Sequence, residues 1–491
     1  MLFNSLEFLI FFPIVLLVYY VLPQKVRYIW LLVASYYFYM CWNVKYVLLL
    51  LMSTVITYVS GLLIDKYKNR IRTKKIIVAL SLITNLGILF FFKYVNFALA
   101  LVTKVFSMVD IDVYMPNFDI ILPVGISFYT FQALSYTIDV YRGDIYSEKN
   151  FARYALFVSF FPQLVAGPIE RSKNLLIQLS TTKRFNYEKA KEGFLLMLWG
   201  FFLKLVLADR IAMFVDTVYG DVDTYQGILV LIATVLFAFQ IYCDFAGYST
   251  IAMGAAMILD IRLMENFSAP YLATSVSDFW RRWHISLTSW FKDYLYIPLG
   301  GNRKGRLRKY LNQMIVFLVS GIWHGASLSF AVWGGLNGMY QVIGDLLKPI
   351  RKRLCELFDL NRNSFGHRLL SGLVTFVLID FSWIFFRAQG IGAALKTIRS
   401  IYPLNNFWVI FDGTLFTLGV DSANFVVMFL SLGALVFADI CKNRKICIRK
   451  VILEQDWWFR CLTVTLSVLV IFVFGVWGNI SGNTQFIYFQ F

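Results

Sequence analysis

The sequence predicts an all-α polytopic membrane protein, and three observations lead to this fold class. The chain has 491 residues, of which 59% are hydrophobic and 18% aromatic, and its mean hydropathy is +0.65. This surplus of apolar surface is typical of a protein immersed in lipid. Long apolar runs alternate with short polar loops, and the basic residues gather in some of these loops. We therefore expect about twelve spans, together with re-entrant and interfacial helices around a central cavity.

The distribution of charge predicts the topology. The net charge is +17, but four loops hold dense basic clusters without an acid, which favours a membrane surface over a nucleic-acid partner. Under the positive-inside rule all four loops face the cytoplasm. The clusters comprise Lys66, Lys68, Arg70, Arg72, Lys74 and Lys75; Arg303, Lys304, Arg306, Arg308 and Lys309; Lys348, Arg351, Lys352 and Arg353; and Lys442, Arg444, Lys445, Arg449 and Lys450.

The spans follow in order from the apolar runs. The first run has no basic region before it and no small-residue cleavage site nearby, so we interpret it as a span and not as a signal peptide. Twelve spans place both termini outside the cytoplasm, and they also place two acidic loops outside (Asp110, Asp112 and Asp119; Asp216, Asp221 and Asp223). The spans lie near residues 6–22, 28–42, 45–64, 76–109, 120–138, 193–214, 227–258, 310–323, 327–346, 369–387, 424–440 and 461–478.

Three segments do not fit as ordinary spans. The run 310–323 is shorter than the ~20 residues that cross a bilayer, and it stops at His324-Gly325, which predicts a break within the membrane. Residues 151–168 are apolar but end in breakers, and we expect them to re-enter the membrane from the cytoplasm. Residues 276–299 mix tryptophans with charged residues, which is typical of an interfacial or cavity-lining helix. Several breaks in one chain predict a cavity, because irregular backbone at membrane depth must be shielded.

The chain reads as a single integral membrane domain over residues 1–491. It divides into N-terminal spans (1–138), a core with the re-entrant segments (139–346), C-terminal spans (347–478) and an extracytoplasmic tail (479–491). No soluble domain, repeat or pair of inverted halves is evident. The six cysteines are scattered, so neither a disulfide framework nor a metal site is expected.

Two of the three histidines lie in segments that do not fit as ordinary spans. His284 lies in Phe279-Trp-Arg-Arg-Trp-His284-Ile-Ser, and His324 lies in Ser320-Gly-Ile-Trp-His324-Gly. An ionisable residue within a membrane domain is by default a candidate functional residue, and imidazole is suited to proton transfer near neutral pH. For each of the two, the alternative is a structural role without catalysis, such as a hydrogen bond to a backbone carbonyl. His367, in a cytoplasmic loop, is expected to be a solvated bystander.

These motifs carry a family resemblance. The two histidine segments, with Tyr296-Ile-Pro-Leu-Gly-Gly301-Asn and Phe161-Pro-Gln-Leu-Val-Ala-Gly167-Pro168-Ile-Glu-Arg171, resemble membrane-bound O-acyltransferases (MBOAT) over essentially the whole chain. The opening, from Met1-Leu-Phe-Asn-Ser to Trp42, is similar to the bacterial branch that acetylates alginate, peptidoglycan or other envelope polysaccharides. The resemblance implies an O-acyltransferase, most simply an O-acetyltransferase, in the bacterial cytoplasmic membrane.

The resemblance also implies roles for the histidines. His324 matches the catalytic histidine of the family and His284 its second signature position. The chemistry agrees, because O-acylation from a thioester needs a base for the hydroxyl proton, and burial keeps imidazole neutral. His284 is then expected to orient the thioester or to stabilise charge at its carbonyl.

The donor is expected to be acetyl-CoA or another acyl thioester, a substrate and not a bound cofactor. Coenzyme A is polyanionic, and basic side chains are ordinary phosphate partners. Lipid headgroups are an equal alternative for Arg303 and Lys304. The candidates for donor binding are Trp280, Arg281, Arg282, Lys292, Asp293 and Arg303.

The last six residues, Phe486-Ile-Tyr488-Phe-Gln-Phe491, resemble the C-terminal aromatic motif of the bacterial branch. In that interpretation the Tyr488 phenol carries the acyl group to a secreted or membrane-anchored acetyltransferase, which acylates a polysaccharide acceptor. An interfacial aromatic belt is the structural alternative. The competing function is a proton-coupled transporter or flippase of an anionic lipid or metabolite, which the absence of half-repeats disfavours. A third alternative is a scaffold protein that has lost its activity, but the presence of both His284 and His324 disfavours it. No nucleic-acid partner is expected.

Overall fold

A computed structural model describes residues 1–491 except 112–113, 115, 117, 403, 478–485 and 488–491. The described residues form helices and loops without a β-strand. Six of their helices are long and apolar enough to cross a membrane, namely Val44–Lys66, Ile71–Ser107, Ile228–Ile258, Phe365–Arg387, Ser422–Asn443 and Trp457–Phe474. The predicted helical, polytopic character is therefore confirmed, whereas the number of twelve spans and the location of the termini stay predictions.

The chain forms two compact units. Unit 1 comprises Met1–Met197 with Ile251–Met264, and unit 2 comprises Leu198–Thr250 with Glu265–Phe491. Residues within each unit contact one another more than they contact the other unit. This division does not test the prediction of a single membrane domain, which stays a prediction.

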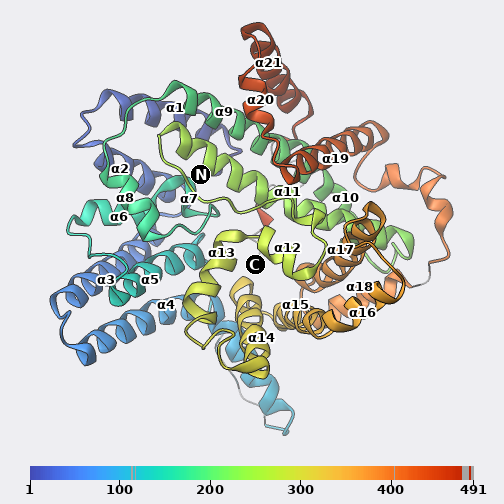
Figure 1. Cartoon of the computed structure of the whole chain (residues 1–491), viewed down its shortest axis with the longest axis horizontal. Helices are drawn as coiled ribbons and strands as arrows, with labels where there is room; N and C mark the ends of the chain where they lie inside the picture. The colour runs from blue at the N-terminus through green and yellow to red at the C-terminus, as the bar shows by residue number, and fades with distance from the viewer. Residues whose placement is uncertain (112–113, 115, 117, 403, 478–485, 488–491) are drawn as a thin grey trace. The chain divides into compact units, whose positions relative to one another are not determined.

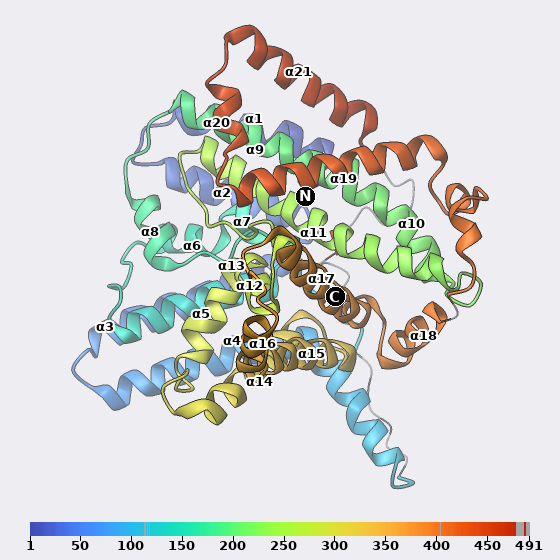
Figure 2. The ribbon, with the colours of Figure 1, turned by 45° about the vertical axis from the view of Figure 1, so that its right-hand side comes forward.

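Unit 1 is built from the N-terminal helices. Its elements are α1 (Leu6–Val21), α2 (Arg27–Met40), η1 (Val44–Tyr46), α3 (Val47–Lys66), α4 (Ile71–Ser107), α5 (Ile126–Arg142), α6 (Phe151–Ser159), α7 (Phe161–Leu164), α8 (Ser172–Ser180) and most of α9 (Tyr187–Phe201). Helices α3, α4 and α5 run side by side (Figure 2). The close approach of α3 and α5 needs Gly61, because a Cβ there would lie 2.6 Å from the Tyr136 ring.

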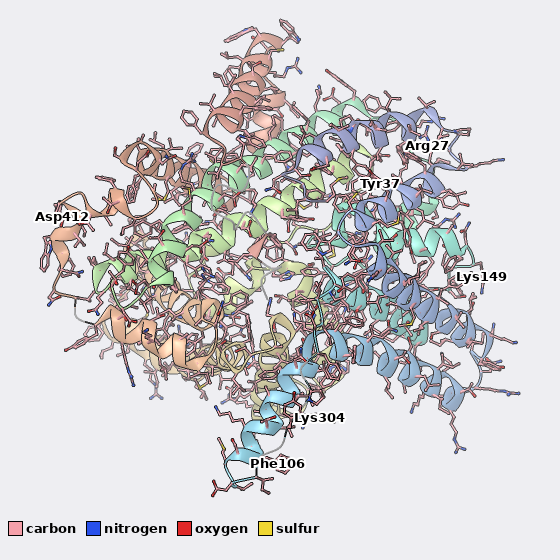
Figure 3. All side chains as sticks on the ribbon, turned by 180° about the vertical axis from the view of Figure 1, so that it is seen from behind. Arg27, Tyr37, Phe106, Lys149, Lys304 and Asp412 are labelled. Atoms are coloured by element: carbon pink, nitrogen blue, oxygen red, sulfur yellow. The ribbon has the colours of Figure 1, made fainter. Side chains whose placement is uncertain are left out.

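Loop residues mark one end of unit 1. Figure 3 shows Arg27, at the start of α2, and Lys149, just before α6, on the same side of this unit. Arg27 donates to the carbonyls of Tyr20, Leu22 and Lys183. Arg27 thus holds two carbonyls at the C-terminal end of α1 and one in the loop between α8 and α9.

Unit 2 contains both histidine breaks. Its elements are the π-helix η2 (Phe202–Ala208), α10 (Asp209–Gly220), most of α11 (Ile228–Ile258), η3 (Pro270–Leu272), α12 (Val276–Arg282), α13 (Ile285–Phe291), the π-helix η4 (Lys292–Tyr296), α14 (Gly305–His324), α15 (Leu328–Leu346), α16 (Lys348–Leu357), α17 (Phe365–Arg387), α18 (Ile391–Ile401), η5 (Phe407–Ile410), η6 (Thr414–Thr417), α19 (Ser422–Asn443), α20 (Ile448–Leu453) and α21 (Trp457–Phe474). Helices α14 and α15 lie side by side (Figure 1). A Cβ on Gly321 would lie 2.2 Å from the carbonyl oxygen of Phe330, and one on Gly334 would lie 2.3 Å from that of Phe317.

Several sequence predictions need correction. The helix that contains the run 310–323 is longer than predicted, because α14 begins at Gly305 and has 20 residues. Arg306, Arg308 and Lys309 lie in its first turns and not in a loop. Residues 276–299 are not one helix, because the chain leaves the helical conformation at Trp283 and His284. His367 does not lie in a loop but in the first turn of α17. Its backbone N–H donates there to the side chain of Ser364, the N-cap of this helix. The break after His324 is confirmed. Residues 151–168 form α6 and α7 with an interruption at Phe160, and their re-entry from the cytoplasm stays a prediction.

Candidate active site

His284 lies at the turn between α12 and α13 in the left-handed region, with φ 43° and ψ 54°. This conformation costs a residue with a Cβ roughly 1–2 kcal/mol, so the surroundings must hold it. Asn266, in the loop between α11 and η3, holds this conformation. Its backbone carbonyl accepts from the N–H of Ile285, and its side-chain oxygen accepts from the hydroxyl of Ser286 at 2.6 Å. The side-chain amide of Asn266 in turn donates to Ser249. The position of His284 is therefore fixed by buried hydrogen bonds on its C-terminal side.

His324 is the last residue of α14. Gly325, which follows, is extended, with φ −160° and ψ 155°, and α15 begins three residues later. Three aromatic side chains surround the imidazole: Trp323 at 4.9 Å, Trp333 at 5.1 Å and Phe386 at 5.3 Å between ring centroids. The end of the helix thus delivers His324 into an aromatic enclosure.

The two histidines meet inside unit 2. Their ring centroids are 6.4 Å apart, and the residues are 1% and 5% exposed. Hydrogen bonds of about 3 Å from each ring could therefore reach one group placed between them. Burial lowers the pKa of His284 to about 3, because desolvation disfavours the charged imidazolium. A neutral imidazole can accept one proton or donate one hydrogen bond, which are the two actions that acyl transfer requires.

The candidates for donor binding do not form one cluster. Trp280 is buried, stands edge-on to Trp333 at 5.6 Å, and donates from Nε1 to Asn337, so it belongs to the aromatic core next to His324. Arg281 and Arg282 pair with Asp278 at 3.7 and 3.0 Å, and Arg282 also donates to Asn443.

The remaining donor candidates lie farther along the chain. Lys292 and Asp293 begin η4, and Arg303 is exposed in the loop before α14. The structure therefore brings together Trp280 and the histidine enclosure, and it leaves Arg281 and Arg303 on the surface.

The C-terminal segment returns to the same unit. Tyr488 lies outside the described residues, but Phe486 and Ile487 immediately before it are 2% and 3% exposed. The Phe486 ring packs on Tyr248 at 5.0 Å and on Phe245 at 5.8 Å, and Phe245 stands edge-on to His284. Phe486 is therefore not part of a surface aromatic belt.

Sequence reasoning gave no role to several buried ionisable residues, among them Lys204, Asp209, Asp244 and Glu170. In unit 2, Lys204 pairs with Asp209 and Asp244. In unit 1, Glu170 accepts from the backbone N–H of Met264 and from Asn174, and burial raises its pKa to about 7. The signal was available, because charged residues inside apolar runs are costly and need partners. Among the described residues no three His, Cys, Asp or Glu side chains gather as metal ligands.

Comparisons with known proteins show the family to which the chain is similar. Residues 145–369 match the model of the membrane-bound O-acyltransferase family, MBOAT. The chain is 33% identical over 500 residues to a protein of Pseudomonas putida named "Probable alginate O-acetylase AlgI", with 100% of both chains covered. It is 31% identical to the peptidoglycan O-acetyltransferase of Helicobacter pylori, covering 100% of this chain and 98% of that one.

A more distant relative is the teichoic acid D-alanyltransferase of Bacillus subtilis, 25% identical over 56% of this chain and 71% of that one. Full-length similarity to two O-acetyltransferases, together with the apolar helices, identifies a multi-pass membrane enzyme that transfers acyl groups other than aminoacyl groups. The chain belongs to the membrane-bound O-acyltransferase family.

Proposed function

We propose that this enzyme takes an acetyl group from acetyl-CoA on the cytoplasmic side and passes it across the membrane for O-acetylation of an envelope polysaccharide. The observation that carries the proposal is the pair of buried imidazoles 6.4 Å apart at two helix breaks. The names of the relatives, an alginate O-acetylase and a peptidoglycan O-acetyltransferase, indicate the class of acceptor. The family is one of acyltransferases, which favours an enzyme over the transporter or flippase alternative.

In the proposed reaction His324 is the general base. It takes the hydroxyl proton while the oxygen attacks the thioester carbonyl, and His284 donates a hydrogen bond to the carbonyl oxygen as negative charge develops there. The carbon–sulfur bond then breaks, and the thiolate of coenzyme A leaves and receives the proton from the His324 imidazolium. The balance is one ester formed and one thioester consumed.

The first acceptor in this proposal is the phenol of Tyr488. A phenyl ester is a reactive carrier because phenol, with a pKa of about 10, is a better leaving group than an alcohol. A secreted or membrane-anchored acetyltransferase would take the acetyl group from Tyr488 and transfer it to a polysaccharide hydroxyl. The burial of Phe486 and Ile487 within unit 2 supports this role. Phe486 packs on Phe245, and Phe245 contacts His284, so the residues just before Tyr488 lie close to a candidate catalytic histidine.

Radiolabelled acetyl-CoA tests the proposal with the purified full-length protein. We expect release of coenzyme A and acetylation of the C-terminal peptide, detected by mass spectrometry. Tyr488→Phe removes only the oxygen, and it should abolish both the peptide label and polymer acetylation in cells while donor binding persists. An unlabelled parent protein would contradict the acyltransferase proposal, and normal polymer acetylation by Tyr488→Phe would exclude the carrier.

A further inference from the structure

A buried cluster of three charged side chains lies in unit 2, away from the two histidines in sequence. Lys204 Nζ is 2.8 Å from Asp209 Oδ1 and 2.6 Å from Asp244 Oδ1, and the side chains are 7%, 8% and 4% exposed. Two carboxylates share one ammonium group, so the cluster carries one excess negative charge. Desolvation makes such a buried cluster weak as a source of stability, which indicates another use for it.

The backbone is arranged to assemble this cluster. Lys204 and Asp209 are five residues apart in and after the π-helix η2, and the Asp209 N–H donates to the Lys204 carbonyl, the spacing of a π-turn. Asp244 comes from α11, and α11 approaches closely at Gly247, where a Cβ would lie 2.9 Å from the Gly200 carbonyl oxygen. The wide turn and the glycine together allow Lys204 to reach both carboxylates.

The second oxygen of Asp244 binds the C-terminal segment. Oδ2 accepts from the backbone N–H of Ile487 at 2.7 Å, although the two residues are 243 positions apart. Phe486 fills the adjacent space against Tyr248 and Phe245. Because the bond is made to backbone, it does not depend on the side chain at 487, and it fixes the register of the segment.

The other end of this segment is attached to the same region. The N–H of Val476 donates to the Leu205 carbonyl at 2.9 Å, and Arg210 donates to the Phe474 carbonyl. The chain is therefore tied to residues 205–210 where it leaves α21, and to Asp244, the partner of Lys204, where it returns at Ile487. The described residues on either side of 478–485 are thus each anchored in unit 2, Val476 to Leu205 and Ile487 to Asp244.

We infer that Asp244, oriented by Lys204, is the positioning residue for the C-terminal acyl-carrying segment, and that its bond to the Ile487 N–H sets the register in which Tyr488 is presented to the histidines. The inference rests on the proposed function for the role of Tyr488, whereas the docking of the segment on Asp244 stands independently of it. Lys204 acts through Asp244, since its ammonium group fixes the carboxylate.

Ile487→Pro tests the docking directly, because proline lacks the N–H that Asp244 accepts, and residue 487 is not part of an α-helix whose backbone the change would break. Ile487→Val keeps the N–H and is the matched control. In a full-length protein without the six native cysteines, Phe486→Cys serves as a reporter for thiol modification. We expect proline at 487 to raise the modification rate about tenfold or more, in line with the loss of a hydrogen bond to a charged acceptor, and valine to leave the rate unchanged.

Two further variants assign the effect to Asp244. Asp244→Leu leaves Lys204 paired with Asp209 in a neutral pair, and it should expose the reporter as Ile487→Pro does. Asp209→Leu alters the same cluster but does not contact the segment, so the reporter should stay protected. An unchanged modification rate in Ile487→Pro would overturn the docking whether or not Asp244→Leu folds, and equal exposure in Asp209→Leu and Asp244→Leu would overturn the assignment to Asp244.

The positioning role is tested by kinetics with the native Phe486. Ile487→Pro should lower kcat for coenzyme A release from acetyl-CoA about tenfold or more with KM unchanged, since the donor site is intact. An exposed reporter with unchanged kcat would overturn the positioning role. A parent protein that releases no coenzyme A would instead contradict the proposed function, and the thiol reporter would still decide the docking.

Discussion

The ring of Phe245 stands edge-on to the imidazole of His284, with 4.7 Å between the centroids and 89° between the planes. Phe245 is also the neighbour of Phe486. One α11 side chain therefore separates a candidate catalytic histidine from the C-terminal segment. The residue before it in sequence, Asp244, holds that segment, so two consecutive positions of α11 serve both features.

His324→Gln should lower the rate of acetyl transfer about 10²–10⁴-fold, the usual contribution of general-base catalysis. Glutamine is close to histidine in volume, whereas alanine would leave a void among Trp323, Trp333 and Phe386. We therefore expect His324→Ala to lose stability as well as activity, contrary to the modest loss that a mere break in a span would imply. Coenzyme A release and thermal unfolding in detergent check the two effects. A glutamine variant that keeps more than about a tenth of the rate would refute the base assignment.

His284 variants should separate strain from chemistry. His284→Asn and His284→Ala both remove the imidazole, and turnover should fall strongly in both. Alanine also carries the left-handed conformation at a cost of roughly 1–2 kcal/mol, whereas asparagine adopts it more readily. Thermal unfolding should thus rank asparagine above alanine. Full turnover in either variant would show that His284 is only structural.

Gly321→Ala should push α14 and α15 apart, because the added Cβ would lie 2.2 Å from a backbone oxygen that cannot rotate away. Overpacking of this kind typically costs about 1–3 kcal/mol of stability. It would also displace His324, which follows Gly321 by three residues in α14. Gly335→Ala on α15 is the control, since the nearest atom to its Cβ is a Leu318 methyl at 3.7 Å. Thermal unfolding of the two variants gives the comparison, and equal stability would show that α14 and α15 can separate without cost.

The membrane orientation can be tested with introduced cysteines in a background that lacks the six native thiols. The positive-inside rule predicts protection of the basic loops from an impermeant thiol reagent in intact cells, and reaction at the acidic loops. Asp221 is exposed, which makes it a suitable reactive position. Reversed labelling would overturn the orientation and the cytoplasmic donor with it. The protected positions are Lys68, Arg306, Lys352 and Lys445, and the reactive ones are Asp112 and Asp221.

The sequence predicted the helical class and the break at His324 because glycine and hydrophobic runs are local signals. The apolar run predicted a start of this helix at Tyr310, five residues after the true start of α14. The basic residues Arg306, Arg308 and Lys309 favoured a loop in the sequence, but charged residues readily continue a helix beyond its apolar run. The left-handed turn at His284 could not be predicted, because it depends on Asn266, eighteen residues earlier.

The cluster of Lys204, Asp209 and Asp244 was missed for a different reason. Averaging hydropathy over a span hides single charges, and the pairing joins helices far apart in sequence. Only a rule that demands a partner for each buried charge would have pointed to it.

The π-helix at Phe202–Ala208 has a genetic consequence. A wide turn is what remains when one extra residue is accommodated in an α-helix without disturbing its neighbours. Removing a single codon between Lys204 and Asp209 would therefore restore regular winding and leave the aspartate four residues after the lysine, still on the same helix face. Gene variants in which one residue is lost from this turn should thus be tolerated better than single-residue losses in a regular helix such as α11, where every later side chain rotates by about 100°.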